Sequence, residues 1–414
     1  MAVLVIGAIV VIAISPAGHT DSTQSAAPAS VTPATAVPAG FTPAWSAQSA
    51  ATTVPALGQS VIVTADGGEV IGHDPATGEA LWHYSRQQQL CTAAVAWPSS
   101  VDEVLAVYRN SRGCSEVTAL NAATGARKGA RTSDADSSLR LITDSGYVLA
   151  QGPTRLETWG SNLVRGIEYG RISAPVNPGV QPDRTDCQIS SAGISGERVA
   201  LIERCAGDPG YRLTVLGALL DGDEKVTQHA STIVTGNTDG PPPVLITMSS
   251  SAIAVYDGGT NSAVPTSPAI RQYDIDGKLL ATSRVNGDAA PPADSVALSS
   301  DGLLTFFTGT DTVILDAQSL KPKYQVPNTL GPGEVMAGRL LLPSPAGITS
   351  RNPATGEDAR TITLDRTTEP QTTEPQTTQE PQTSQDAQPT VSLRVLGDQV
   401  IEQRGSQIEV FSPS

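Results

Sequence analysis

The pattern of apolar and polar positions repeats along the chain as a unit of three short predicted strands. The first copy, residues 61–82, reads Val-Ile-Val-Thr-Ala-Asp-Gly-Gly-Glu-Val-Ile-Gly-His-Asp-Pro-Ala-Thr-Gly-Glu-Ala-Leu-Trp. Apolar residues alternate over each strand, as they do where one face of a strand packs against a neighbour. Gly78 supplies the positive φ that a tight turn needs. The unit is therefore predicted to be a three-stranded antiparallel sheet, with Trp82 filling the space beside it.

The same unit returns seven times. Its copies span residues 104–131, 147–170, 198–230, 252–285, 303–326, 339–364 and 400–411. Repetition at this spacing is typical of a β-propeller, an all-β ring of sheets called blades. The last copy lacks an outer strand, and residues 41–47 resemble the missing strand, so we predict that the N-terminal strand pairs with the C-terminal blade and closes the ring. The count is eight blades, or seven if one weak copy is a decorated hairpin.

Composition and charge agree with an all-β body and make some partners unexpected. Aromatic residues make up 4% and charged residues 16% of the chain, and no long segment has the 3.6-residue apolar period of a helix. The net charge is −15, and lysine and arginine do not cluster. Because nucleic acids and anionic membranes attract basic surfaces, we expect neither as a direct partner.

The N-terminal segment predicts export from the cytoplasm. Residues 1–15 form a nearly unbroken apolar run, and residues 16–40 form a linker rich in Ala, Pro, Ser and Thr. The run is shorter than the roughly 20 residues that span a bilayer and has no basic flank. It is interpreted as a membrane anchor whose first residues are missing or, alternatively, as a cleaved signal peptide. No cysteine follows it, which argues against a lipoprotein. The propeller, residues 41–414, is expected at the outer face of the plasma membrane.

The four cysteines suit such an oxidising compartment and predict two local disulfides. They fall as two pairs in the second and fourth blades: Cys91, Cys114, Cys187 and Cys205. A metal site is the alternative, although neither pair has the Cys-x-x-Cys spacing of a zinc knuckle. The histidines show no ligand spacing either: His19, His73, His83 and His229.

Two acidic phrases could bind Ca²⁺, because carboxylates two residues apart can reach one ion. They are Asp221-Gly-Asp223 and Asp274-Ile-Asp276-Gly277. Neither continues to the distal Glu of an EF-hand loop, so both are predicted to be turns.

A second low-complexity segment, residues 365–389, repeats Thr-Glu-Pro-Gln-Thr and cannot bury a core. We predict a disordered loop inserted before the last blade. It is interpreted as a neutral surface insertion or, alternatively, as a partner-binding or glycosylated tether.

The phrase Asp-x-x-Thr-Gly-x-x-x-Trp of residues 74–82 resembles the repeat of quinoprotein dehydrogenases and their non-enzymatic relatives. The resemblance spans roughly residues 41–414 and is strong in the first, second and seventh blades. It implies a propeller, and for the enzymes it implies a quinone and Ca²⁺ held at the ring axis beside a vicinal disulfide. This chain has no adjacent cysteines and lacks that family's Trp-rich motif in every blade. Nor does it carry a Gly-x-Ser-x-Gly or His-Glu-x-x-His motif. We therefore expect no enzyme activity, no catalytic or metal-binding residue and no cofactor.

A closer resemblance lies in residues 45–48, 104–114, 155–160 and 208–216. These stretches are similar to the polar growth factor A group, anchored periplasmic proteins of mycobacteria and related mycolate-forming actinobacteria. The resemblance implies that the propeller binds or escorts the glycolipid trehalose monomycolate. It also implies a partner, an RND-type mycolate transporter of the inner membrane, and a role in envelope biogenesis and polar growth. No ligand-binding residue can be carried over. Three apolar candidates are instead predicted to be blade core: Leu304, Phe306 and Phe307.

Two hypotheses from different classes follow. A lipid carrier should have a cleft lined by apolar side chains that are not packed between blades. A protein-protein scaffold of an envelope complex, without lipid binding, should instead present a surface patch for its partner. A quinoprotein-type dehydrogenase is a weaker third, and it would need carboxylates and an arginine that converge in the axial channel.

Overall fold

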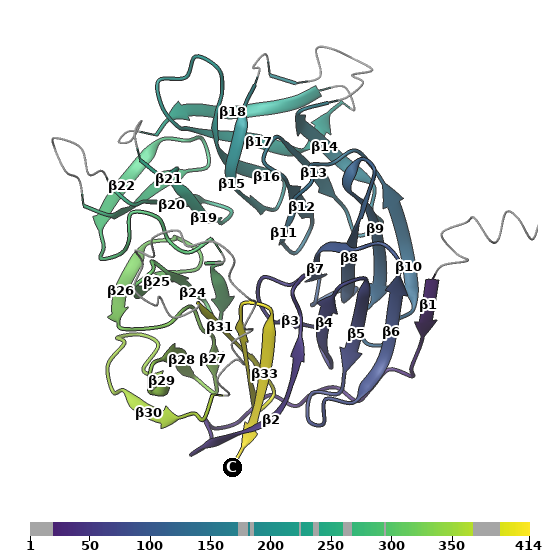
Figure 1. Ribbon diagram of the computed structural model, residues 1–414. Helices are drawn as coiled ribbons and strands as arrows, with labels where there is room; N and C mark the ends of the chain where they lie inside the picture. Colours follow the sequence, from purple (N-terminus) through teal and green to yellow (C-terminus); the bar gives the residue numbers. More distant parts are fainter. Residues whose placement is uncertain are drawn as a thin grey trace, which may run out of the picture.

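Each copy of the three-strand unit folds as predicted, and an additional inner strand completes it to a four-stranded antiparallel blade (Figure 1). The computed structural model describes residues 20–172, 181–182, 186–222, 225–234, 240–259, 267–293, 295–366 and 390–414. The predicted membrane anchor and residues 367–389 of the predicted loop lie outside these residues. Among the described residues no helix occurs, and none forms a segment able to cross a membrane as a helix.

Eight sheets form the ring, so the prediction of eight blades is confirmed. Blade 1 contains β3 (Ala56–Leu57), β4 (Ile62–Asp66), β5 (Glu69–His73) and β6 (Ala80–Arg86), with β1 (Thr20–Thr23) added outside β6. Blade 2 contains β7 (Leu90–Ala96), β8 (Glu103–Asn110), β9 (Gly113–Asn121) and β10 (Arg127–Thr132). Blade 3 contains β11 (Arg140–Thr143), β12 (Val148–Gln151), β13 (Arg155–Trp159) and β14 (Arg165–Gly170). Blade 4 contains β15 (Gln188–Ser195), β16 (Arg198–Arg204), β17 (Arg212–Asp221) and β18 (Lys225–Ile233).

The second half of the ring repeats this order. Blade 5 contains β19 (Val244–Met248), β20 (Ala252–Asp257), β21 (Ala269–Asp274) and β22 (Leu279–Arg284). Blade 6 contains β23 (Leu298–Ser300), β24 (Leu303–Phe307), β25 (Asp311–Asp316) and β26 (Pro322–Pro327). Blade 7 contains β27 (Val335–Met336), β28 (Arg339–Ser344), β29 (Gly347–Arg351) and β30 (Arg360–Thr363). Blade 8 contains β31 (Val391–Leu396), β32 (Gln399–Arg404), β33 (Gln407–Pro413) and, as its outer strand, β2 (Phe41–Gln48).

The two ends of the chain close the ring. β2 pairs antiparallel with β33, in a register that runs from Phe41 opposite Pro413 to Gln48 opposite Gln407. The predicted closure by terminal strand pairing is confirmed. β2 thus covers the backbone edge of β33, which would otherwise be an open sheet edge.

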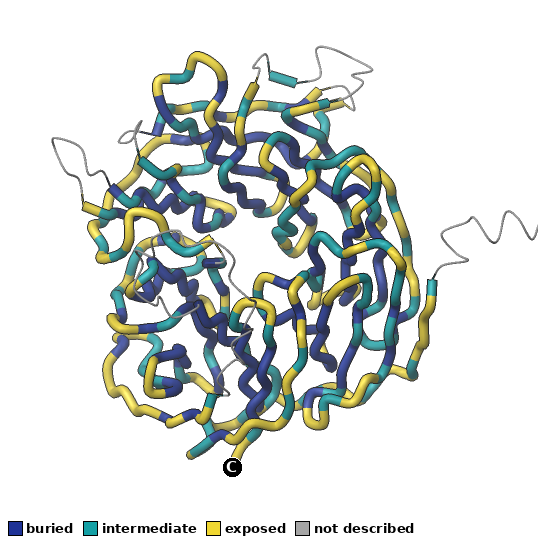
Figure 2. The backbone as a smooth tube through the Cα atoms, viewed as in Figure 1, coloured by how far each residue is buried: buried dark blue, intermediate teal, exposed yellow. Residues whose placement is uncertain are grey.

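The hydrophobic core lies in layers between neighbouring blades, and the tube in Figure 2 is darkest along these strands. Alternation along one strand supplies two layers. Val104 and Ala106 of β8 pack toward blade 1, whereas Leu105 and Val107 pack toward blade 3. Each blade is thus buried on both faces, which explains why its middle strands are continuously apolar.

The repeated Asp/Asn-x-x-Thr-Gly sequence forms a turn that packs against an aromatic side chain of the neighbouring blade. Asp74 Oδ1 accepts hydrogen bonds from the backbone N–H groups of Ala76 and Thr77, both at 2.9 Å, and Gly78 follows at φ +73°. The indole N–H of Trp45 in blade 8 donates to Pro75 O at 2.9 Å. A Cβ at Gly78 would lie 2.6 Å from the Trp45 ring, so only glycine lets the turn approach this closely.

The same contact between an aromatic side chain and the turn of the next blade occurs at two further positions. Trp82 of blade 1, 1% exposed, covers Gly125 of blade 2 and donates to Ala122 O at 2.9 Å. Tyr324 of blade 6 covers Gly356 of blade 7 and donates to Pro353 O at 2.8 Å. The prediction that Trp82 fills the space between sheets is confirmed.

Both predicted disulfides are present. Cys91–Cys114 connects β7 with β9 inside blade 2, and Cys187–Cys205 connects the residue before β15 with the residue after β16 in blade 4. Such bonds form and persist in oxidising compartments. No free cysteine remains in the chain.

Residues 20–40, which fall in the range expected to form a linker, lie against the ring. β1 pairs antiparallel with β6, and Arg360 Nη2 of blade 7 donates to Pro38 O at 2.6 Å. Ala34 and Val37 pack against the core layer between blades 7 and 8. Figure 1 shows the segment passing from β1 along the lower edge of the ring to β2. The sequence does not predict this arrangement, because β1 has no apolar side chains and is held to β6 by backbone pairing.

Candidate binding groove

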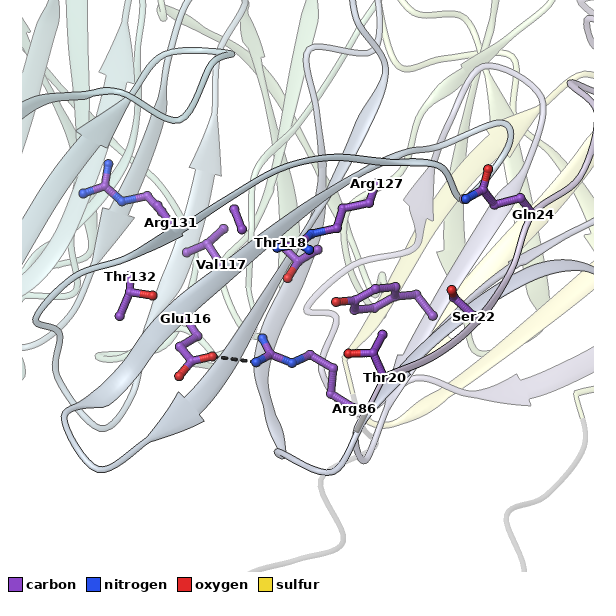
Figure 3. A pocket seen from close by; sticks show the side chains of 13 residues that line it. Thr20, Ser22, Gln24, Arg86, Glu116, Val117, Thr118, Arg127, Arg131 and Thr132 are labelled. Carbon is purple, nitrogen blue, oxygen red and sulfur yellow. Dashed lines mark hydrogen bonds and ion pairs between the residues drawn. The ribbon is translucent and has the colours of Figure 1, made fainter. Parts of the chain in front are cut away.

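A groove of about 410 Å³ opens at the rim of the ring, between the outer strands of blades 1 and 2 (Figure 3). We call it the rim groove. Its walls come from β1 and β6 on one side and from β9 and β10 on the other. The size falls in the range of about 300–1,000 Å³ typical of ligand sites. Most of the side chains that line the groove are polar, which is unusual for a ligand site. They include Thr20, Gln24, Tyr84, Arg86, Glu116 and Arg127.

β1 builds one wall by extending blade 1 outward. Its register places Thr20 opposite Arg86 and Thr23 opposite His83. Thr23 Oγ1 accepts a hydrogen bond from the His83 backbone N–H at 3.2 Å and lies 3.0 Å from His83 Nδ1. The imidazole also lies 3.5 Å from a carboxylate oxygen of Asp21. These contacts hold a short, exposed strand on the edge of the sheet. Thr20 and Ser22 of this strand line the groove, together with Gln24, which directly follows it.

An ion pair crosses the groove between the two blades. Arg86 Nη2 lies 2.6 Å from Glu116 Oε2, and the two side chains point toward each other in Figure 3. The Arg86 guanidinium also stacks 4.8 Å from the centroid of the buried Tyr108 ring. Burial alone would raise the pKa of Glu116, but hydrogen bonds from Asn110 and Arg86 together lower it below the usual range. Glu116 is therefore a paired, ionised carboxylate near neutral pH.

The remaining arginines of the groove differ in their partners. Arg131 turns toward blade 3, where it donates to Leu163 O at 2.7 Å and to Glu157 Oε2 at 3.1 Å. Arg127 is exposed, and its side chain makes no hydrogen bond or ion pair with any described residue, while its backbone pairs with Leu120 of β9. It leaves the groove with one uncompensated positive charge in a protein of net charge −15.

The acidic phrases form turns, as predicted, where the structure describes them. Asp274 Oδ1 accepts hydrogen bonds from the backbone N–H groups of Asp276 and Lys278, at 3.0 and 2.8 Å, and Gly277 has φ +76°. This carboxylate is committed to its own turn. Asp221 ends β17, and Asp223 lies outside the described residues.

The histidines are not brought together. His73 is buried, within 2.8 Å of Thr64 Oγ1 and 3.0 Å of Gly78 O, and burial lowers its pKa. His83 holds β1, and burial lowers the pKa of His229 on β18. His19 lies outside the described residues.

One trio of potential metal ligands occurs among the described residues, formed by Cys187, Glu203 and Cys205 within 4.8 Å of one another. The two sulfurs are bonded to each other, so neither is the thiolate that metals bind. Both Glu203 oxygens accept hydrogen bonds from the Tyr169 hydroxyl, at 3.1 and 3.0 Å. The trio is therefore part of the core structure of blade 4.

The apolar candidates for lipid contact lie in the core, as predicted. Leu304, Phe306 and Phe307 on β24 are 4%, 1% and 5% exposed. Phe306 packs against Tyr256 with ring centroids 5.7 Å apart. Leu304 and Phe306 belong to the core layer between blades 5 and 6.

Comparisons with known proteins locate the fold. No family model matches the chain, and no curated protein matches it. Among solved structures, BamB from Moraxella catarrhalis is 11% identical, with 90% of this chain and 99% of that chain covered and a TM-score of 0.50. The computationally designed Ika8 protein is 12% identical over 90% and 99%, with a TM-score of 0.53. Sqt1 of Saccharomyces cerevisiae is 8% identical over 92% and 99%, with a TM-score of 0.52. At these identities the likeness establishes the β-propeller fold alone.

Proposed function

We propose that the protein is a non-enzymatic propeller that holds a segment of a partner protein at its rim groove, as part of an envelope assembly outside the cytoplasm. The observation that carries the proposal is Arg127, exposed on the groove wall and unpaired among the described residues, next to arginines that are already paired. A cation left open in an acidic protein favours an acidic segment, because complementary charge steers and orients association. The two disulfides support the oxidising location.

The groove chemistry supports binding rather than catalysis. Its lining includes no histidine and no cysteine, and its single carboxylate is Glu116. A general acid or base works best when its pKa is near the ambient pH. Hydrogen bonds from Asn110 and Arg86 lower the pKa of Glu116, so this carboxylate is a poor general acid or base. Hydroxyl, amide and guanidinium groups remain, and these groups recognise polar ligands.

Charge reversal tests the proposal. We expect Arg127→Glu to reduce the amount of partner recovered with the protein at least about tenfold, because a repulsive charge then replaces an attractive one in the groove. Recovery would be measured by quantitative mass spectrometry of complexes purified from native cells. Lys128→Glu is the matched control, since Lys128 is exposed on the same strand but does not line the groove. Equal loss of partner in both variants, or in neither, would contradict the role of the groove.

The second candidate is the glycolipid escort implied by the polar growth factor A resemblance. The polar lining of the groove, which includes Tyr84, favours this candidate because a sugar head group binds to polar and aromatic side chains. Val117 and Ala130 are the only aliphatic side chains that line the groove, so it offers little apolar surface to a mycolate chain, and a protein partner is the better supported of the two.

Native mass spectrometry separates the two candidates. The chain from Thr20 to Ser414, which keeps β1 as one wall of the groove, would be incubated with trehalose monomycolate and with a matched phospholipid. We expect no stoichiometric adduct with either lipid if the partner is a protein. A one-to-one adduct with the mycolate alone, lost in Arg127→Glu, would favour the escort.

A further inference from the structure

We propose that β1 ties the rim groove to the membrane, so that the segment bound in the groove belongs to an integral membrane protein and lies next to the part that spans the bilayer. This role of β1 rests on the proposed function, to which it adds the class of partner, and on the predicted membrane anchor of residues 1–15. The pairing of β1 carries it, because that pairing limits how far the groove can stand from the bilayer.

The connection between the predicted anchor and β1 is short. The apolar run ends at Ser15, and β1 begins five residues later at Thr20. A fully extended chain advances at most about 3.6 Å per residue, so these two residues lie no more than about 18 Å apart. If the ring were held only from Phe41, where β2 begins, the connection could reach about 90 Å. Pairing of β1 with β6 therefore turns a long linker into a short one.

β1 is part of the groove as well as the point of attachment. Thr20 and Ser22 line the groove, and Thr20 lies opposite Arg86 in the register and beside it in Figure 3. Beyond the strand, the backbone N–H of Ser25 donates to Thr124 O in the β9–β10 turn at 3.2 Å. The chain is thus fixed to both blades that form the groove. The groove cannot move away from the bilayer unless β1 leaves β6.

The charges at this edge suit a protein segment better than an anionic lipid surface. Asp21 lies in β1 itself with its side chain 86% exposed, and it would repel acidic head groups. Arg127 offers its positive charge inside the groove. Segments of membrane proteins on the outer side carry fewer lysines and arginines than cytoplasmic loops do, so an acidic segment beside the bilayer meets this cation without repulsion.

The ring contains its own reference point for a measurement of distance. Blade 6 lies opposite blade 2, four blades away in either direction (Figure 1). Lys128 on β10 and Lys323 on β26 are exposed on the outer strands of these two blades. A connection at β1 holds Lys128 near the bilayer and does not hold Lys323 there. The difference between the two positions can be measured without knowledge of the partner.

Energy transfer in vesicles tests the position of the groove. The full chain, purified with its N-terminal segment intact, would carry a donor dye at Lys128→Cys or at Lys323→Cys in phosphatidylcholine vesicles that contain an acceptor lipid. Because no free cysteine occurs in the chain, each variant has one labelling site. We expect the transfer from position 128 to be at least about twice that from position 323, since the connection is short.

Two insertions separate the role of β1 from that of the linker as a whole. About 20 Gly and Ser residues inserted between residues 19 and 20 form a flexible coil, so the difference between the two dye positions should disappear. The matched control is the same insertion between Ala29 and Ser30, two exposed residues that follow β1. It should leave the transfer unchanged, because β1 still pairs with β6.

Recovery of the partner from native cells tests its class. The insertion before β1 lengthens the connection about fivefold, so we expect about tenfold less partner, because effective concentration falls with roughly the 3/2 power of linker length. The insertion after β1 should not change recovery. The recovered protein should have a membrane-spanning segment, with its acidic segment directly beside it.

Three results would overturn the inference: equal transfer from positions 128 and 323, transfer from position 128 that the insertion before β1 leaves unchanged, or a partner without a membrane-spanning segment. If the transfer results fail while recovery still depends on Arg127, the proposed function stands and only the attachment through β1 is wrong. If transfer behaves as expected while recovery is independent of Arg127, β1 does position the groove, and the proposed function is wrong.

Discussion

A chain that begins at Ser49 is expected to lose its cooperative unfolding transition, whereas a chain that begins at Gly40 is expected to keep it. The difference between them is β2, whose pairing with β33 is the closure of the ring. Without β2, the edge of β33 is unpaired, Phe41 no longer fills the layer between blades 7 and 8, and Trp45 no longer covers Gly78. We expect a loss comparable with the whole stability of a domain, about 5–15 kcal/mol.

Thermal and urea unfolding followed by circular dichroism would measure this effect. The chain that begins at Gly40 is the matched control, because it lacks β1 and the rest of residues 20–39 but retains β2. Equal midpoints for the two truncated chains would show that terminal pairing does not hold the ring closed.

The second large effect is expected at the buried ion pair of blade 8. Arg366 donates from Nε to Glu402 Oε2 at 2.7 Å and from Nη2 to Oε1 at 2.8 Å, and the Glu402 side chain is 0% exposed. The same guanidinium donates to Ser344 O and Gly347 O of blade 7. Arg366→Ala leaves the Glu402 carboxylate buried without its partner, so we expect the free energy of unfolding to fall by about 3–5 kcal/mol.

Urea unfolding of three variants would isolate the cause. Arg339→Ala removes the ion pair with Asp358, whose side chain is 81% exposed. Loss of this ion pair should lower the free energy of unfolding by less than about 1 kcal/mol. The variant also loses a hydrogen bond from Arg339 to Ser350 O, as Arg366→Ala loses those to Ser344 O and Gly347 O. The double variant Arg366→Met/Glu402→Leu replaces the pair with apolar groups and should recover most of the loss. A cost of Arg366→Ala no larger than that of Arg339→Ala would contradict the account of a desolvated, stranded charge.

The outer three strands of each blade could be predicted because their signals are local. Alternating apolar residues and the turn from Asp74 to Gly78 lie within a few residues of one another, and the same chemistry recurs at Asn121 and Asn352. Two of the inner strands, β3 and β27, could not be predicted because they are two residues long and too short to show a period. β1 was missed because its polar side chains give no apolar pattern.

The rim groove could not be predicted, since it depends on which residues of neighbouring blades face each other. Arg86 and Glu116 lie 30 residues apart, and their pairing follows from the packing of β6 against β9. Nothing in the chain around Arg127 distinguishes it from the paired Arg131, four residues further on.

The most direct test of a protein-binding role is photo-crosslinking from the rim groove in native cells, with the benzophenone amino acid at Gln24, which lines the groove from the end of β1. The account predicts a crosslink to an acidic segment of another protein that disappears in Arg127→Glu and persists in Lys128→Glu. A crosslink to glycolipid alone, or a protein crosslink that is equally strong in the Arg127→Glu variant, would contradict it.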